Sequence, residues 1–209
     1  MYIPEAFRES RTEVLHDLIR QHSFATLVSQ TERGLVATHL PLLLDPSRGQ
    51  LGTLRGHVAR ANDHWRALAE PGEQLAIFQG PHAYVSPAWY QTPMAVPTWN
   101  YVAVHAYGRP TLIDGGPALR QILDDTVALF EAQLAYQWRP PDGDFIPTLM
   151  RNVVGFELEL TRLEGKLKLS QNRARADQEG VVAGLRAQAD PLGLAVADLM
   201  AAGLARSGP

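Results

Sequence analysis

The sequence contains no cysteine, which excludes disulfide bridges, thiolate metal ligands and cysteine nucleophiles together. This absence fits a reducing compartment. No stretch approaches the roughly 18 uninterrupted apolar residues that a membrane-spanning helix needs. The first residues include Pro4, Glu5 and Arg8, where a signal peptide needs an apolar run. We therefore expect a soluble cytoplasmic protein with no membrane partner.

An excess of positive charge is missing as well. The formal net charge is −3, and residues 174–209 contain three Arg against four acidic residues. Lys and Arg supply most of the non-specific affinity of proteins for nucleic acid. We therefore expect direct DNA binding to be weak or absent.

Familiar catalytic and metal-binding motifs are also absent. The sequence has no Ser-His-Asp order, no HExxH motif, no P-loop and no GxGxxG motif. His82 and His105 have no carboxylate spaced to join them as a metal ligand. We predict no metal site and assign no catalytic residue.

The length sets the domain count. A chain of 209 residues buries about 70% of its unfolded surface on folding and needs no disulfide or metal. We predict one domain over residues 1–173, with a helical C-terminal extension over 174–209 packed on the same domain.

Short β-strands dominate the predicted elements. Hydrophobic periodicity and turn residues predict both classes of element. The strands are 24–30, 35–44, 51–58, 75–80 and 100–108, and then two strands within 153–170 that are separated at 163–165. The helices are 12–21, 62–69, one that begins at Pro117, and two short ones after Ala174 that are separated at Asp190-Pro191. Because the first three strands have no helices between them, we expect a mainly β, α+β fold with antiparallel pairing. The order of elements leaves a small closed barrel and a sandwich open.

The centre of the chain is unusually aromatic. Residues 75–108 hold two of the four Trp and four of the six Tyr. Proline punctuates the segment between the two strands, and proline stiffens a loop. This segment is suited to be a wall for a flat ligand or for a second subunit, and core or interface packing is the alternative.

A first candidate cluster combines Thr38, His39, Leu40 and Pro41 with residues 56–62. If the second and third strands pair, these residues share one rim of the sheet. Arg60 beside a helix start then offers a cation and free N–H groups to a phosphate. The alternative is that Arg60 is a solvated surface charge and that the histidines are structural.

A second candidate cluster lies near the end of the last strand. Lys166, Lys168 and Ser170 point the same way on a strand, and residues 151–175 carry six Arg or Lys against three Glu. This pattern indicates an anion site. An edge strand that uses Lys to discourage aggregation explains it equally well.

The chain resembles the PaiB-type family of FMN-binding negative transcriptional regulators nearly end to end. The matching motifs are Met1-Tyr2-Ile3-Pro4, His39-Leu40-Pro41, Gly56-His57-Val58-Ala59-Arg60-Ala61-Asn62, Gly80-Pro81-His82-Ala83-Tyr84-Val85-Ser86-Pro87, Val96-Pro97-Thr98-Trp99-Asn100-Tyr101 and Gly165-Lys166-Leu167-Lys168-Leu169-Ser170-Gln171-Asn172. The resemblance implies a flavin-reductase-like split β-barrel with peripheral helices. It also implies a cytoplasmic homodimeric flavoprotein that holds FMN between its subunits and acts as a transcriptional regulator.

The resemblance assigns roles to residues. It places His57, Arg60 and Asn62 near the flavin phosphate, His39, Leu40 and Pro41 along the isoalloxazine ring, and Trp99, Asn100 and Tyr101 against it from the other subunit. The full expected set of FMN contacts is Thr38, His39, Leu40, Pro41, His57, Arg60, Ala61, Asn62, Trp99, Asn100, Tyr101, Lys166 and Lys168. Two other functions stay open: an FMN-dependent oxidoreductase, and a split barrel that binds haem or another flat ligand.

Overall fold

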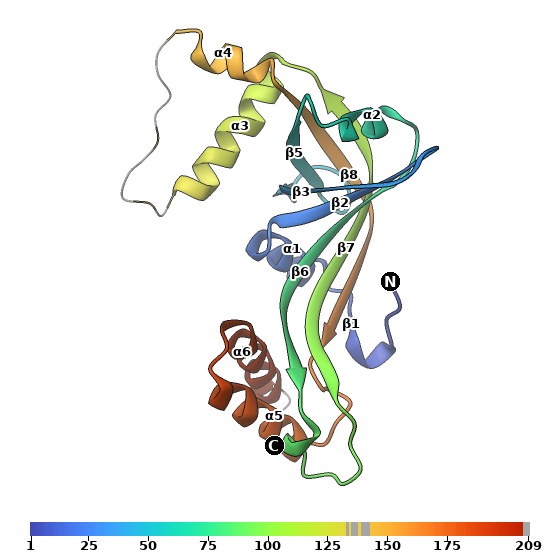
Figure 1. Cartoon of the computed structure of the whole chain (residues 1–209), viewed down its shortest axis with the longest axis vertical. Coiled ribbons are helices and arrows are strands. Elements are labelled where there is room, and N and C mark those ends of the chain that lie inside the picture. Colours follow the sequence, from blue (N-terminus) through green and yellow to red (C-terminus); the bar gives the residue numbers. More distant parts are fainter. Residues whose placement is uncertain (133, 135–137, 139–142, 207–209) are drawn as a thin grey trace. The chain divides into compact units, whose positions relative to one another are not determined.

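The helices and strands of the computed structural model follow one another as Figure 1 shows. The structure describes residues 1–132, 134, 138 and 143–206. In chain order the elements are η1 (Glu5–Phe7), β1 (Arg8–Glu9), α1 (Thr12–Gln21), β2 (Phe24–Thr31), β3 (Gly34–Pro41), β4 (Leu43–Asp45), β5 (Thr53–Ala59), α2 (His64–Ala69), β6 (Gln74–Val85), η2 (Pro87–Trp89), β7 (Thr98–Ile113), α3 (Gly116–Glu131), α4 (Phe145–Met150), β8 (Val153–Lys168), α5 (Arg175–Gln188) and α6 (Pro191–Arg206).

The chain divides into two compact units. Unit 1 comprises residues 1–15, 79–104 and 164–209, and unit 2 comprises residues 16–78 and 105–163. Strands β6, β7 and β8 each contribute residues to both units.

Unit 2 contains the barrel. Neighbouring strands lie in the order β3-β2-β6-β7-β8-β5-β4, so β3 and β4 stand at opposite ends of the list. Only Leu42 separates β3 from β4 in the chain, and this short link requires the sheet to curl until its ends meet. The structure therefore confirms a split barrel over a sandwich.

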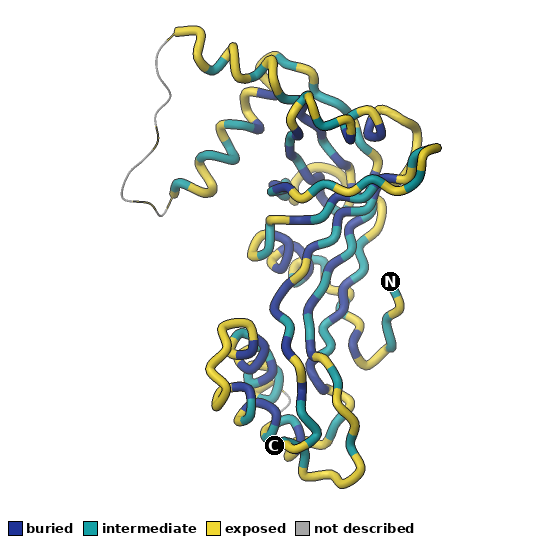
Figure 2. Tube along the Cα trace, in the orientation of Figure 1, coloured by how far each residue is buried: buried dark blue, intermediate teal, exposed yellow. Residues whose placement is uncertain are grey.

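The burial of alternate residues shows which face of a strand meets the core. On β7, Asn100, Val102, Val104 and Ala106 are all at most 1% exposed, while the residues between them are only partly buried (Figure 2). Side chains of a strand point alternately to its two faces, so this pattern gives β7 one core face. The predicted strand at 100–108 is confirmed, although β7 extends beyond it at both ends.

Two predictions about the elements need correction. Strand β8 is continuous through 163–165, where two strands were expected. Gly165 does not break the strand; it allows close packing, because a Cβ there would lie 2.2 Å from Leu15 Cδ2 and 2.8 Å from the carbonyl oxygen of Glu9 on β1. Helix α4 was not predicted, since it is short and contains Pro147.

Helices α5 and α6 belong to unit 1, where they pack side by side (Figure 1). Their shared core includes Val181, Leu185, Val196 and Met200, each at most 2% exposed. The two predicted C-terminal helices are thus confirmed. None of the helices within the described residues is long and apolar enough to cross a membrane.

Candidate functional site

A partly buried polar network occupies one rim of unit 2. The Nδ2 group of Asn62 donates to Thr38 Oγ1 at 3.0 Å, and Thr38 Oγ1 is also 2.7 Å from Nδ1 of His64. The other ring nitrogen of His64 lies 2.7 Å from Ser29 Oγ. The structure therefore brings Thr38 and Asn62 together, although β3 pairs with β2 and β5 pairs with β4 and β8.

His64 was missed by the sequence analysis. Its side chain is 1% exposed, and burial lowers the pKa of its imidazole. Both ring nitrogens are hydrogen-bonded to hydroxyl groups of β2 and β3. His64 thus holds the rim in place, and no pattern in the sequence links it to Ser29 or Thr38.

The residues that follow Thr38 on β3 alternate in exposure. His39 is exposed, and its Nδ1 lies 2.9 Å from Oγ1 of Thr26, its register partner on β2. Leu40 is buried and Pro41 is partly buried. Of these predicted ring contacts, His39 has the most accessible side chain.

His57 lines an apolar cavity in unit 2. The cavity has a volume of about 380 Å³, and its walls include Leu123, Val127, Leu149 and Val153. Burial lowers the pKa of His57, so the imidazole is neutral at pH 7. Ligand cavities in proteins are commonly of this size and character.

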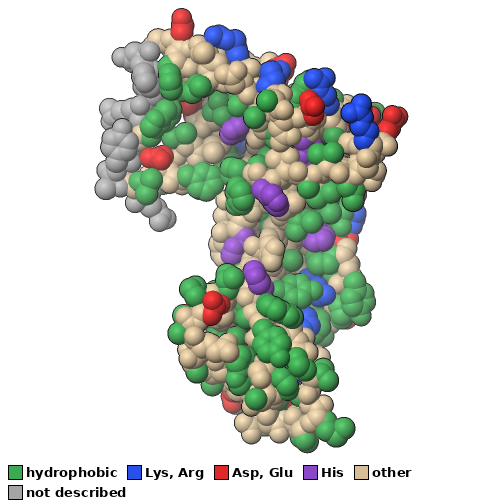
Figure 3. Space-filling view, in the orientation of Figure 1, with side chains coloured by type: hydrophobic (Ala, Val, Ile, Leu, Met, Phe, Trp, Pro, Cys, Tyr) green, Lys and Arg blue, Asp and Glu red, His purple; other side chains and the backbone are tan. Residues whose placement is uncertain are grey.

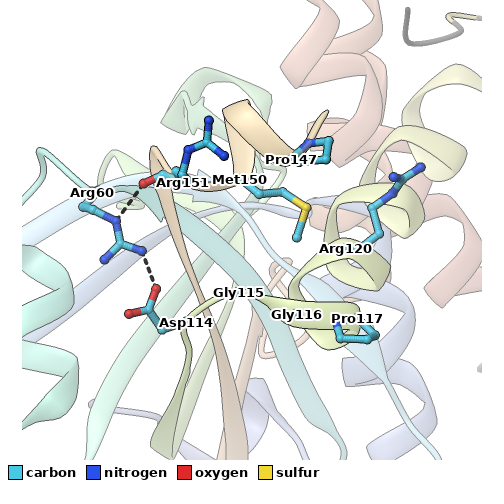
Figure 4. Close-up of a pocket in the computed structure, with 9 residues that line it drawn as sticks. All are labelled: Arg60, Asp114, Gly115, Gly116, Pro117, Arg120, Pro147, Met150 and Arg151. Atoms are coloured by element: carbon cyan, nitrogen blue, oxygen red, sulfur yellow. Dashed lines mark hydrogen bonds and ion pairs between the residues drawn. The ribbon is translucent and has the colours of Figure 1, made fainter. Parts of the chain in front are cut away.

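Arg60 is held by neighbours from distant parts of the chain. Its Nε donates to the carbonyl oxygen of Arg151 at 2.9 Å and its Nη2 donates to the carboxylate of Asp114 (Figure 4). The same Nη2 also donates to the carbonyl oxygen of Val153. A guanidinium has five N–H donors, so three of them are engaged. Arg60 is therefore a partly exposed cation whose guanidinium already has hydrogen-bond partners.

The backbone around Arg60 is also engaged. The N–H of Asn62 donates to the carbonyl oxygen of Ala59, and the N–H of Arg60 donates to that of Asn152. Helix α2, which follows Ala61 and Asn62, has only six residues. We expected Arg60 and the N–H groups of Ala61 and Asn62 to converge on a phosphate. Fewer of these donors are free to do so than the sequence indicated.

A pocket of about 530 Å³ lies beside Arg60 and contains two further arginines. Arg120 pairs with Asp124 one turn along α3, and Arg151 donates to Thr148 Oγ1. Figure 4 shows that the three guanidinium groups point in different directions. The pocket also contains Asp114, so its cations do not converge on one anion.

Unit 1 contains Lys166 and Lys168, which are the two lysines of the sequence. Lys166 is 7% exposed; its Nζ donates to the carbonyl oxygen of Tyr2 at 3.0 Å and lies 5.4 and 5.2 Å from the ring centres of Tyr2 and Tyr101. Cation–π contacts and a carbonyl acceptor stabilise this buried ammonium. Tyr101 therefore contacts Lys166, as its place in the expected set allows.

Lys168 lies two residues further along β8. Its Nζ donates to Thr98 Oγ1 and to the carbonyl oxygen of Trp99, both at 2.5 Å. Strand β8 has neighbouring strands on both sides, so the edge-strand explanation of its lysines is wrong. Asn100 is fully buried and donates to Ser170 Oγ at 2.9 Å, which fixes the end of β8 to β7.

The two Trp of the central segment have different surroundings. Trp89 packs on α5, where a Cβ at Gly184 would lie 2.3 Å from its indole. Trp99 is 54% exposed, with Tyr84 edge-on at 6.0 Å and His82 at 6.4 Å between ring centres. Figure 3 shows hydrophobic side chains at the surface of the part of the molecule that contains α5 and α6. Trp99 and Tyr84 thus form an accessible aromatic surface, which we call the Trp99 face.

The thirteen expected contacts fall into two groups. Eight belong to unit 2 and five belong to unit 1. The unit 2 group is Thr38, His39, Leu40, Pro41, His57, Arg60, Ala61 and Asn62, and the unit 1 group is Trp99, Asn100, Tyr101, Lys166 and Lys168. Within each group the structure joins some members directly: Asn62 to Thr38, Lys166 to Tyr101, and Lys168 to Trp99.

Comparison with known proteins identifies the family. Residues 1–162 match the family described as "Putative FMN-binding domain". The chain belongs to this family. Members of the FMN-binding family include a PaiB-type relative: the chain is 30% identical over 205 residues to "Protease synthase and sporulation protein PAI 2" of Bacillus subtilis, covering 96% of each protein.

Solved structures confirm the fold of this FMN-binding family member. The FAD and haem binding protein of Mycobacterium smegmatis matches with a TM-score of 0.61 at 18% identity, over 85% of this chain and 80% of that one. The flavocytochrome Anf3 of Azotobacter vinelandii matches with a TM-score of 0.60 at 13% identity, over 77% of this chain and 69% of that one. These neighbours agree with the split barrel.

The residues of unit 1 fit the flavin that the family implies as cofactor. FMN combines a flat aromatic ring with a phosphate, so it needs an accessible flat surface and a cation. The Trp99 face provides the first, and Lys168, which is hydrogen-bonded to the backbone of Trp99, provides the second. The cofactor of this chain is a flavin, as its family membership indicates.

Proposed function

We propose that this chain is an FMN-binding homodimer that acts as a negative regulator of gene expression. The observation that carries the proposal is the exposed Trp99 beside the ammonium of Lys168, in a member of an FMN-binding family. Bound FMN supplies a ring that can accept and donate electrons. Trp99 offers this ring a flat apolar surface, and the thirteen residues named above are the candidate contacts.

A titration of FMN tests this binding. We expect saturable quenching of flavin fluorescence, a shift of the visible flavin absorption, and weaker binding of FMN by Trp99→Ala. Phe24→Ala is the matched control, because Phe24 is an exposed aromatic of unit 2 at 69%. FMN spectra that do not change on adding the wild-type protein contradict the proposal.

The homodimer is supported by apolar side chains that unit 1 leaves exposed. Met94 is 99% exposed, Val96 65% and Trp99 54%, and all three lie in or beside the loop between β6 and β7. Monomers rarely leave large contiguous apolar patches in water. A second copy of the chain that covers this loop accounts for their exposure.

Sedimentation equilibrium tests the dimer. We expect a species of twice the 23.0 kDa chain mass at micromolar concentration. Val96→Glu should shift the equilibrium toward monomer, because a carboxylate in an apolar interface is costly to desolvate. Leu35→Glu, at a residue of unit 2 that is 74% exposed, should leave it unchanged. A wild-type protein that sediments only as monomer excludes the dimer.

The regulatory role is supported by the Bacillus subtilis relative, whose name refers to protease synthesis and sporulation. We infer that regulation does not depend on tight contact with DNA. Arg175 pairs with Glu179 and Arg186 pairs with Asp198, so two of the three arginines after residue 173 are already neutralised. A sub-micromolar, sequence-specific shift of duplex DNA at ~150 mM salt contradicts this inference.

A second candidate function is an FMN-dependent oxidoreductase. The observation in its favour is the apolar cavity beside the neutral imidazole of His57, which suits a small organic substrate. Reduction of the bound flavin by NAD(P)H at a rate above that of free FMN favours the oxidoreductase. A flavin that NAD(P)H reduces no faster than free FMN favours the regulator.

A further inference from the structure

A small basic pocket lies in unit 1, apart from the residues that surround Arg60. It has a volume of about 150 Å³, and its walls include Lys168, Arg173, Tyr90, Thr98 and Ser170. All of its lining residues belong to the described part of unit 1, and none of them is Asp or Glu. The lining therefore carries two positive charges that no carboxylate of the wall neutralises.

Lys168 has capacity for another acceptor. An ammonium has three N–H donors, and two of them are used by the neutral oxygens of Thr98 and Trp99. Burial, and then the neighbouring charges of Lys166 and Arg173, lower the pKa of Lys168. An anion in the pocket reverses this charge repulsion, because it stabilises the protonated amine.

Arg173 contributes to this pocket a guanidinium group with unused hydrogen-bond donors. It lies 5.0 Å from the ring centre of Tyr90, and its side chain makes no hydrogen bond or ion pair with any residue that the structure describes. Its own backbone N–H donates to the carbonyl oxygen of Ser170 at 2.9 Å, which holds the residue at the pocket. By contrast, Arg175 pairs with Glu179 at 2.9 Å.

The acidic residue that acts on Arg173 electrostatically is occupied elsewhere. Asp177 accepts hydrogen bonds from the N–H groups of Gln91 and Thr92 and from Thr92 Oγ1, at 2.6 to 2.9 Å. These three donors engage both carboxylate oxygens. Asp177 therefore fixes the loop after Tyr90 and leaves the donors of Arg173 free.

We propose that the pocket of Lys168 and Arg173 binds a phosphoryl group. An arginine offers two parallel N–H donors to phosphate, and a lysine adds a point charge. The phosphoryl group belongs either to FMN, a reading that rests on the proposed function, or to a free phosphate that binds as an effector. Both sources need the same two side chains.

Three titrations of the full-length protein, with FMN, riboflavin and inorganic phosphate, test the pocket. We expect FMN to bind about ten- to a hundredfold more tightly than riboflavin, because charge-assisted hydrogen bonds are lost without the phosphate. Arg173→Gln should weaken FMN binding by about tenfold and leave riboflavin binding unchanged. Arg175→Gln removes the same charge two residues away and should change neither.

The source of the phosphoryl group follows from competition. If inorganic phosphate displaces FMN toward the affinity of riboflavin, the phosphate of FMN occupies the pocket. If inorganic phosphate binds the wild type but not Arg173→Gln, while FMN and riboflavin bind equally, the pocket takes a free phosphate. Either result supports the proposal.

The proposal is overturned if folded Arg173→Gln and Lys168→Gln variants bind FMN and phosphate as the wild type does. Arg173 is partly exposed, so its variant carries the test even if Lys168→Gln does not fold. Absence of any flavin binding in the wild type overturns the proposed function alone, because the phosphate titration still reports on the pocket.

Discussion

Gly184 on α5 is a position at which one added methyl group should clearly disturb unit 1. A Cβ there would lie 2.3, 2.5 and 2.6 Å from three indole carbons of Trp89. Carbon atoms in contact are normally about 3.5–4.0 Å apart. Gly184→Ala therefore requires the Trp89 ring or α5 to move by about 1 Å. Gly203→Ala makes the same change on α6, where the new Cβ would meet no described atom within 4 Å apart from its chain neighbours and the backbone of its own helix.

The comparison of these two variants separates packing from helix propensity. Replacing Gly by Ala inside a helix stabilises it by up to about 1 kcal/mol, and this gain applies to both. Overpacking costs about 1–3 kcal/mol and applies only at Gly184. We expect the free energy of unfolding of Gly184→Ala to fall below that of Gly203→Ala by about 1–3 kcal/mol, which corresponds to about 2–12 °C in Tm.

Urea unfolding followed by far-UV circular dichroism measures both free energies. A third variant, Gly184→Ala with Trp89→Ala, supplies the control, because removal of the indole should abolish the penalty of the new methyl group. Equal unfolding free energies for Gly184→Ala and Gly203→Ala refute the packing of Trp89 against α5.

Three further predictions concern buried polar groups. Burial lowers the pKa of His64, so the unfolded chain binds a proton more readily than the folded protein as the pH falls below about 6.5. The free energy of unfolding of the wild type should therefore decrease with falling pH, and more steeply than that of His64→Gln, when urea unfolding is measured from pH 7.0 to 5.5. An equal slope in the two proteins argues against a buried neutral imidazole. Hydrogen bonds from Thr92 lower the pKa of Asp177, so its stabilising effect is present above about pH 4 and lost below; Asp177→Asn should make the loop at Thr92 more sensitive to limited proteolysis at pH 7, and an unchanged cleavage rate counts against the contact. Asn100→Ala leaves Ser170 Oγ without its amide partner inside the protein and should cost about 1–3 kcal/mol of unfolding free energy; a loss below ~0.5 kcal/mol excludes the bond.

Local signals in the sequence predicted much of the fold. Helix α1 begins and ends at the expected residues, because the apolar spacing and the end signals of this helix lie within one short segment. The interruption of β8 was wrong, since Gly165 is required by the approach of β1, which lies more than 150 residues earlier in the chain. Element order did not distinguish barrel from sandwich, because closure depends on which strands pair.

The site was less predictable for the same reason. The partners of Arg60 are Asp114, Arg151 and Val153, and no spacing in the sequence connects them to it. The lysines of β8 were expected to contact an anion, but Arg173 was left out of the expected set. The proposed role of Arg173 rests on a difference that sequence spacing does not reveal. Arg175 pairs with the carboxylate of Glu179, whereas the side chain of Arg173 pairs with no described residue.

The continuity of β8 decides where a fragment of this chain can end and still fold. The family match ends at residue 162, inside this strand of Val153–Lys168. A fragment that stops there loses Lys166 and Gly165, the register partners of β1, and loses Ser170, to which Asn100 is bonded. The end of the family match is therefore not a boundary of folding. We expect a protein truncated at residue 162 to aggregate, because it exposes an unpaired strand edge and a buried amide.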